Sequence, residues 1–207
     1  MSRIYFVEGN IGCGKTTILD AIQKYIQETN ITDIEVIYEP VRIWQELGLL
    51  DKFYKDIRRW SYTFQNVAFI TKMMELEKLK TKGDKIYIVE RSPMTDRNCF
   101  AELCFESGFM TEMEWQAYNM WYNHYINSFE YDGFIYLKAE PERCLERINT
   151  RNRGEETSIS IDYLNSLHQK HQLWLDGENK EKLYLDDNYT LDTIHSAVQQ
   201  VLDFINA

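Results

Sequence analysis

Residues 9–16 read Gly-Asn-Ile-Gly-Cys-Gly-Lys-Thr and fit the phosphate-binding pattern G-x-x-x-x-G-K-[ST] at every fixed position. The segment stands between an apolar stretch at 4–8 and a helical pattern at 15–28, which is the strand–loop–helix context that the motif requires. The loop therefore predicts an α/β fold that binds a nucleoside triphosphate. It does not say what receives the phosphoryl group.

Apolar strands alternate with helical patterns along the rest of the chain. We expect strands at 4–8, 35–39, 85–90, 133–138 and 182–186, and helices at 15–28, 57–81, 96–106, 111–129, 141–148, 160–174 and 190–205. This alternation predicts a five-stranded parallel sheet with helices on both faces, in a single domain over 1–207. Functional side chains should gather just beyond the carboxyl ends of the strands.

The composition narrows the choice of partners. A net charge of −10 argues against a nucleic-acid-binding surface, which needs a basic stripe. No signal peptide or membrane-length apolar run is seen, so we expect a cytoplasmic protein without a membrane partner. The cysteines form no Cys-x-x-Cys pair and are expected to be reduced thiols: Cys13, Cys99, Cys104 and Cys144.

The loop residues have separate expected roles in binding ATP. Glycines allow the backbone amides to surround a phosphate, and the amino end of the following helix adds a favourable dipole. Lys15 should reach the β- and γ-phosphates, and the Thr16 hydroxyl can ligate Mg²⁺. The expected phosphate-binding set in this region is Gly9, Asn10, Ile11, Gly12, Cys13, Gly14, Lys15, Thr16 and Thr17.

Three classes of P-loop protein compete: a nucleotide-driven switch, a kinase with a phosphorylated acceptor, and a kinase with a neutral hydroxyl acceptor. Only the neutral hydroxyl needs a carboxylate as general base. Glu39, expected at the end of the second strand, is the candidate base. Glu90, at the end of the third strand, stands where P-loop enzymes often keep a second carboxylate on the side of the metal ion. Arg91 beside it could bridge the phosphate and the acceptor. The plainer interpretation is a solvated Glu39 and an ordinary ion pair at 90–91.

Arginines cluster near the end of the expected helix 141–148. Arg147 and Arg151 share a helix face, and Arg153 precedes Gly154. This pattern suits a lid over the transferring phosphates, at about 147–158, although a solvated helix end would look similar.

The helical stretch 57–81 carries aromatic residues around one amide. Trp60, Phe64 and Phe69 at helical spacing are typical of core, but Gln65 both donates and accepts hydrogen bonds and can read the edge of a base. His168 and His171 lack a third ligand at a sensible spacing, so we interpret them as packing or surface residues.

Five segments occur in an order that is specific to one family: "EGNIGCGKTT", "EPVRIW", "RRWSYTFQ", "ERSPMTDR", and "RNRGEE" followed by "YLNSLHQKHQLWL". From about residue 3 to about 187, the chain resembles the deoxynucleoside kinases of the deoxycytidine kinase, deoxyguanosine kinase and insect-type group. The resemblance implies a P-loop kinase with an arginine-bearing lid. It also implies ATP or another triphosphate as donor, Mg²⁺, and a homodimer.

The resemblance also implies residue roles. Glu39 matches the general base, Glu90 the metal-side acid, and Arg91 its neighbour at the 5′ end of the nucleoside. Tyr54 and Glu156 match the pair that holds the 3′-hydroxyl, and Gln65 and Phe100 match the residues that read and stack on the base. Trp44 matches an aromatic wall of the nucleoside site, and Phe64 is assigned to that site as well. Arg147, Arg151 and Arg153 match lid arginines, and Asp187 lies in a segment similar to the donor-base loop.

The sequence departs from the family at the base pocket. Asp96 matches the aspartate of cytidine- and purine-selective members, but Lys72 stands where those members have an arginine. Lys72 can supply the charge but not the fork of donors. We therefore expect phosphorylation of deoxycytidine, deoxyadenosine or deoxyguanosine in preference to thymidine, in nucleotide salvage. The alternatives are a thymidylate-kinase-like enzyme with a nucleoside monophosphate acceptor and a P-loop switch.

Overall fold

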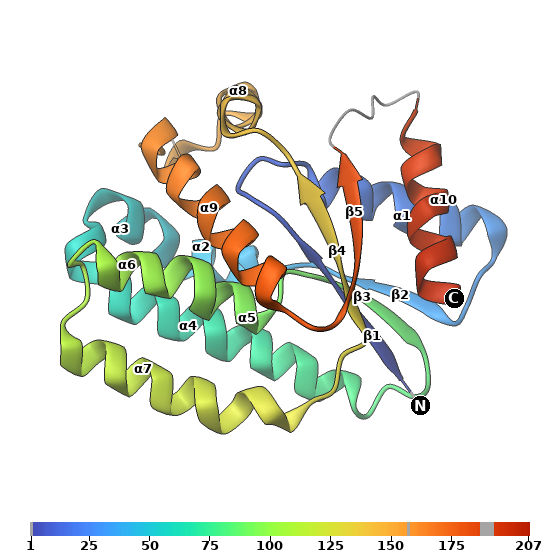
Figure 1. Cartoon of the computed structure of the whole chain (residues 1–207), viewed down its shortest axis with the longest axis horizontal. Helices are drawn as coiled ribbons and strands as arrows, with labels where there is room; N and C mark the ends of the chain where they lie inside the picture. Colours follow the sequence, from blue (N-terminus) through green and yellow to red (C-terminus); the bar gives the residue numbers. More distant parts are fainter. Residues whose placement is uncertain (1, 157, 187–192) are drawn as a thin grey trace.

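A computed structural model describes residues 2–156, 158–186 and 193–207. These residues form a five-stranded, all-parallel sheet in the order β2-β3-β1-β4-β5 (Figure 1). The strands are β1 (Arg3–Glu8), β2 (Ile34–Ile37), β3 (Ile86–Glu90), β4 (Gly133–Lys138) and β5 (Glu181–Asp186). The predicted sheet is thus confirmed.

Helices cover both faces of the sheet (Figure 1). The α-helices are α1 (Lys15–Thr29), α2 (Val41–Glu46), α3 (Leu49–Lys55), α4 (Ile57–Leu79), α5 (Pro93–Thr95), α6 (Glu102–Glu106), α7 (Glu112–Tyr125), α8 (Pro141–Arg151), α9 (Ile161–Gly177) and α10 (Ile194–Asn206). A π-helix, η1 (Asp96–Ala101), and two 3₁₀ turns, η2 (Ile126–Ser128) and η3 (Gly154–Glu156), complete the described elements.

Alternation along the central strand β1 divides the core into two layers. Tyr5 and Val7 pack in the cluster that contains the buried faces of α1 and α10. Ile4 and Phe6 pack in the other cluster, with α4 and α7. Successive side chains of a strand point to opposite faces, so a central strand in a covered sheet must be apolar throughout. β1 ends in a buried glutamate, Glu8, which breaks this pattern.

The second strand is shorter than predicted. It stops at Ile37, so Glu39 lies beyond the strand rather than at its end. Pro40 follows and favours an extended residue before it. The Glu39 N–H donates to the Glu90 carboxylate (3.3 Å) instead of to a strand. Glu39 still lies at the carboxyl edge of the sheet, as predicted, but it is a loop residue rather than a strand residue.

Two short helices, α2 and α3, were not predicted. They are separated by Gly48, which adopts φ of 62°. At six and seven residues, both are too short to show a clear helical period. The helix expected at 96–106 is instead the succession η1 and α6. The other predicted helices agree within a few residues, and 190–192 of the last one lie outside the described residues.

The phosphate loop follows β1 and requires glycine where the chain passes its neighbours. A Cβ on Gly9 would stand 2.6 Å from the Leu137 carbonyl oxygen, and the φ of Gly9 is 143°. A Cβ on Gly12 would stand 2.6 Å from the Cys144 carbonyl oxygen. Both close contacts are with backbone atoms, which cannot move away as a side chain can by changing rotamer. Gly9 and Gly12 therefore exclude larger residues.

All four cysteines lie in the described chain, are buried and form no disulfide bond there. Within the described parts of the chain, none of the helices combines the length and the apolar character needed to span a membrane.

Candidate active site

A cavity of about 530 Å³ opens at the carboxyl edge of the sheet, where β1, β2 and β3 end. The P-loop lines one part of it, α2, α3, α4 and η1 line another, and residues of α8, η3 and α9 line a third. Predicted residues that line it are Ile11, Gly12, Gly14, Lys15, Thr16, Thr17, Glu39, Trp44, Tyr54, Phe64, Gln65, Glu90, Arg91, Asp96, Phe100, Arg147, Arg151, Arg153 and Glu156.

The P-loop is held in shape by side chains as well as by glycine. The Asn10 amide donates to the Leu164 carbonyl of α9 (2.9 Å), and its oxygen accepts the Ile11 N–H (2.9 Å). Arg147 of α8 donates to the Cys13 carbonyl (2.9 Å). Gly9, Asn10 and Cys13 do not line the cavity, and the side chains of Asn10 and Cys13 contact other groups of the loop instead.

Lys15 lies inside the loop. Its Nζ donates to the carbonyls of Gly9 (3.1 Å) and Asn10 (2.7 Å). Burial lowers the pKa of Lys15, and the nearby Arg91 charge adds to this effect. A third hydrogen-bond partner of Lys15 Nζ is the Cys13 sulfur (3.6 Å). A buried ammonium whose hydrogen-bond partners among the described residues are two carbonyls and a thiol suits a further, anionic partner such as a phosphate.

Thr16 and Glu90 form the second polar pair of the loop. The Thr16 hydroxyl donates to Oε1 of Glu90 (2.9 Å), and both residues line the cavity. Neighbouring ligands of octahedral Mg²⁺ are separated by roughly 3 Å, and Mg²⁺ prefers oxygen ligands with few protein groups among them. The two side chains therefore fit an Mg²⁺ site that is completed by water and phosphate oxygens.

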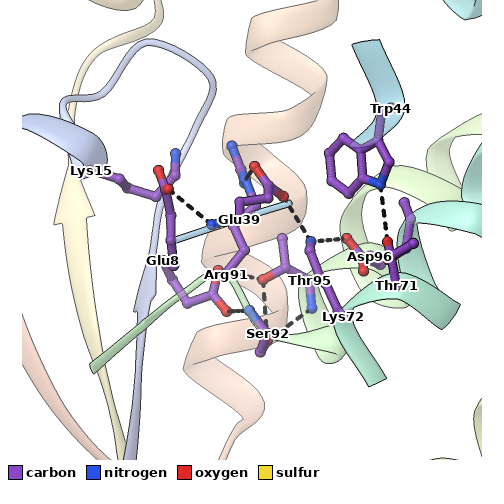
Figure 2. Close-up of polar contacts among 12 residues, drawn as sticks. Glu8, Lys15, Glu39, Trp44, Thr71, Lys72, Arg91, Ser92, Thr95 and Asp96 are labelled. Atoms are coloured by element: carbon purple, nitrogen blue, oxygen red, sulfur yellow. Dashed lines mark hydrogen bonds and ion pairs between the residues drawn. The ribbon is translucent and has the colours of Figure 1, made fainter. Parts of the chain in front are cut away.

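Glu39 belongs to a buried network with two cations (Figure 2). Its Oε1 lies 2.8 Å from Lys72 Nζ, and its Oε2 lies 3.5 Å from Arg91 Nε. Lys72 Nζ also lies 2.5 Å from Oδ1 of Asp96. One ammonium is therefore shared between the predicted general base and the predicted base-reading carboxylate, in a region where all three side chains are largely excluded from solvent.

The network sets the charge state of its members. Burial alone would raise the pKa of Glu39, but Lys72 and Arg91 hold it below the usual range, so Glu39 is ionised at neutral pH. Burial raises the pKa of Asp96 to about 6, in opposition to the effect of Lys72. Oδ2 of Asp96 is buried and has no hydrogen-bond partner among the described residues.

Arg91 has an unusual backbone. Its φ of 60° is in the left-handed region, which costs a residue other than glycine about 1–2 kcal/mol. Its guanidinium donates to the Gly9 carbonyl (2.9 Å) and lies 4.9 Å from the centre of the Phe100 ring. Arg91 thus connects the P-loop, Glu39 and the predicted base-stacking ring.

Aromatic rings form the wall of the cavity opposite the P-loop. Trp44 of α2 meets Phe64 of α4 edge to face, with ring centres 5.5 Å apart, and its Nε1 donates to the Thr71 hydroxyl (3.0 Å). Gln65 lies 3.9 Å from the Cys104 sulfur, a weak partner that leaves the amide available. Lys72 does not line the cavity: it stands behind Asp96 and Glu39.

Two of the three arginines near the end of α8, Arg151 and Arg153, converge on Glu156. Arg151 Nε donates to Oε2 of Glu156 (2.9 Å), and Arg153 lies 3.5 Å from Oε1 of the same carboxylate. Burial raises the pKa of the Tyr54 phenol on α3, and the negative charge of the nearby Glu156 raises it further. The structure brings the predicted 3′-hydroxyl pair together. Asp187 lies outside the described residues.

Several cavity residues were missed by the sequence analysis: Tyr38, Val41, Leu50, Phe53, Ala68, Tyr163 and Ile194. Phe53 stacks on Phe64 at 4.6 Å, and Tyr163 has a buried hydroxyl without a partner among the described residues. The apolar segment 49–54 beside Gly48 was the available signal for Leu50 and Phe53. Tyr163 begins the family segment "YLNSLHQKHQLWL", but that pattern does not show that its side chain reaches the cavity from the first turn of α9.

Comparison with known proteins agrees with this geometry. Residues 5–207 match the family model for deoxynucleoside kinase. The chain belongs to the deoxynucleoside kinase family. It is 34% identical to a probable deoxycytidine kinase of fowlpox virus, over 97% of this chain and 87% of the relative. It is 36% identical to human deoxycytidine kinase and 34% identical to the mitochondrial deoxyguanosine kinase of Xenopus laevis, over 82% and 84% of this chain respectively and 74% of each relative.

Proposed function

We propose that this deoxynucleoside kinase family member transfers the γ-phosphoryl group of ATP to the 5′-hydroxyl of a deoxyribonucleoside, in nucleotide salvage. The observation that carries the proposal is Glu39, an ionised carboxylate held by Lys72 and Arg91 in the cavity that begins at the P-loop. A neutral hydroxyl must lose its proton to attack phosphorus, and Glu39 can accept it.

The remaining groups stabilise charge and fix position. Lys15 faces the charge that develops on the transferred group, and Arg91 lies between the P-loop and Glu39, where donor and acceptor meet. Thr16 and Glu90 would hold Mg²⁺, which supplies neutralisation of the donor phosphates when bound. Tyr54 and Glu156 would orient the acceptor through its 3′-hydroxyl.

Asp96 supports a preference for a base with an amine or a ring N–H. Its Oδ1 is already occupied by Lys72, while Oδ2 is buried and unpaired within the described chain. An ionised carboxylate only accepts hydrogen bonds. Thymine would present a carbonyl where cytosine presents its amine, and two acceptors would face each other unpaired. Deoxycytidine, deoxyadenosine and deoxyguanosine are therefore the proposed acceptors.

The test is phosphoryl transfer from ATP to the four deoxynucleosides and to dTMP, measured side by side. We expect transfer to an amine-bearing deoxynucleoside and little transfer to dTMP. Preferred transfer to dTMP would support the monophosphate-kinase alternative, for which a general base such as Glu39 is superfluous. Hydrolysis of ATP that is independent of any acceptor would support a P-loop switch.

Glu39→Gln tests the role of the carboxylate. The change keeps the shape and removes the basicity, so kcat should fall by about 10²–10⁴ with a much smaller change in nucleoside affinity. Glu46→Gln is the matched control, because Glu46 is an exposed carboxylate on neighbouring α2 that pairs only with Arg42 in the structure described. An intact kcat with weakened nucleoside binding in Glu39→Gln would make Glu39 a positioning residue only.

We also propose that the chain forms a homodimer through α4 and α7. Large apolar side chains are exposed on these adjacent helices: Met113 (73%), Met120 (74%) and Trp121 (49%) on α7, and Met74 (53%) on α4. Such a patch favours a partner surface. Sedimentation of the wild type and of Met120→Glu should show a dimer and a monomer, whereas a wild-type monomer would refute the proposal.

A further inference from the structure

Glu8 is a buried carboxylate for which the proposed reaction has no use. It ends β1, directly before Gly9 of the P-loop, and its exposed fraction is 0%. It does not line the cavity, so it cannot touch a bound nucleoside or nucleotide there. Burial of an ionisable group costs free energy unless hydrogen bonds satisfy it. The hydrogen-bond partners of Glu8 therefore indicate what the side chain does.

Both oxygens of Glu8 bind the corner that joins β3 to α5 (Figure 2). Oε1 accepts the Ser92 N–H (2.8 Å), and Oε2 accepts the Thr95 hydroxyl (2.5 Å). The Ser92 hydroxyl in turn accepts the Thr95 N–H (3.1 Å) and caps α5. Glu8 therefore fixes both ends of this short turn.

The same corner contains the left-handed residue Arg91. Its N–H donates to the Val7 carbonyl (3.0 Å), so consecutive residues of β1 hold consecutive residues of the corner: Val7 holds Arg91, and Glu8 holds Ser92. A strained backbone persists only where its surroundings over-determine it. The carboxylate of Glu8 supplies two of the bonds that do so.

The conformation of this corner decides where the Arg91 guanidinium lies. From a φ of 60°, the side chain reaches the Gly9 carbonyl at 2.9 Å and Glu39 at 3.5 Å. A change of φ toward the ordinary region would turn the side chain away from both. Misplacement of a reacting group by about 1 Å can cost about 10²-fold in rate.

We propose that Glu8 is a positioning residue for phosphoryl transfer: it locks the β3–α5 corner and thereby holds Arg91 between the P-loop and Glu39. This inference rests on the proposed function and adds to it a residue that acts without contacting substrate. The competing interpretation is that Glu8 only stabilises the fold.

Glu8→Gln separates the two interpretations. The amide keeps the size but replaces one acceptor oxygen with an NH₂ group, which must face either the Ser92 N–H or the Thr95 hydroxyl. We expect kcat to fall by about 10–10²-fold, with KM for the nucleoside changed by less than about threefold. Asp132→Asn is the control, because Asp132 accepts the Ile4 N–H (2.7 Å) at the opposite end of β1.

A double-mutant cycle identifies the route of the effect. If Glu8 acts through Arg91, Glu8→Gln should cost less than about twofold once Arg91 is alanine, but its full factor in a Tyr54→Phe background. Equal losses in both backgrounds would show a general effect on the fold and would overturn the proposal. Thr95→Val, which removes one of the two bonds and leaves Glu8, should show the same coupling with a smaller loss.

Amide hydrogen exchange provides a readout that needs no turnover and keeps the test decisive if Arg91→Ala is too slow to assay. Glu8→Gln should speed exchange at 91–92 while leaving β4, at 133–138, unchanged. Unchanged exchange at 91–92 would refute the lock. Absence of any nucleoside phosphorylation by the wild type would refute the proposed function instead, so the two failures are distinguishable.

Discussion

Replacement of Lys72 by methionine should destabilise the fold far more than the loss of an ordinary lysine. The Lys72 side chain is 5% exposed and lies 2.8 Å from Glu39 and 2.5 Å from Asp96. Methionine fills the same volume without the charge. Glu39 keeps Arg91 at 3.5 Å, but Asp96 loses the partner of Oδ1 and already has none at Oδ2 in the described chain.

The magnitude follows from the burial of the network. Removal of one partner from a buried ion pair costs about 3–5 kcal/mol, because it leaves an uncompensated buried charge. For a chain of this size each kcal/mol lowers Tm by about 2–4 °C, so the expected loss is roughly 6–20 °C. Lys78→Met is the matched control: Lys78 pairs with Glu75 on the surface, and such a pair contributes only about 0–1 kcal/mol.

Urea unfolding without substrate, followed by tryptophan fluorescence, measures these differences. A second variant, Lys72→Met with Asp96→Asn, removes the orphaned charge and should recover about 2 kcal/mol or more. If Lys72→Met unfolds within 1 kcal/mol of the wild type, or if the second change recovers nothing, the three side chains do not form the buried network described.

The pH dependence of the deficit gives a further check. Asp96 has a folded pKa of about 6 even beside Lys72, and loss of the cation raises it further above the unfolded value of about 3.9. A raised carboxyl pKa penalises the folded state most above the folded pKa, and the penalty disappears below the unfolded pKa. Wild type and variant share one unfolded state, so the difference between them changes with pH only between their two folded pKa values. The deficit of Lys72→Met should therefore shrink as pH falls from 7.5 to about 6 and should change little from there to pH 5.

Other predictions test the donor site, the lid and the base pocket. Lys15→Ala should lower kcat by roughly 10²-fold or more in an ATP-dependent assay, because it removes a cation aimed at developing charge, and near-normal turnover would contradict this role. Hydrogen exchange across 147–158, which carries Arg147, Arg151 and Arg153, should slow when a bisubstrate analogue binds, whereas unchanged exchange with the analogue bound would rule out a lid. Below pH 6, kcat/KM for an amine-bearing nucleoside should fall by up to about tenfold per pH unit as Asp96 protonates, and Asp96→Asn should abolish that dependence; the same slope in both forms would assign it to another group.

The sequence was sufficient for the sheet, the P-loop and most cavity residues, because those depend on local pattern and on motifs of fixed spacing. It was insufficient where tertiary contacts decide. The location of Lys72 behind the cavity wall, bound to two carboxylates, depends on how α4 packs against η1 and the loop after β2. Tyr163 opens a family segment at 163–175, but its entry into the cavity depends on the path of α9, which the sequence pattern does not reveal. Glu8 fits the apolar strand pattern only as its last residue, and its bonds to Ser92 and Thr95 in the β3–α5 corner depend on the tertiary structure.

The π-helix η1 makes the base pocket sensitive to chain length. Asp96 begins it and Phe100 lies four residues later, and both line the cavity. A π-turn accommodates one more residue than an α-turn. Deletion of a single residue between them would remove this extra residue, so the segment could rewind as α-helix with α6 kept in its register. Such a deletion would shorten the spacing of Asp96 and Phe100 from four residues to three and would turn the ring relative to the carboxylate. Chain length in η1, as well as side-chain identity, can therefore alter the proposed base pocket without displacing the helix that follows.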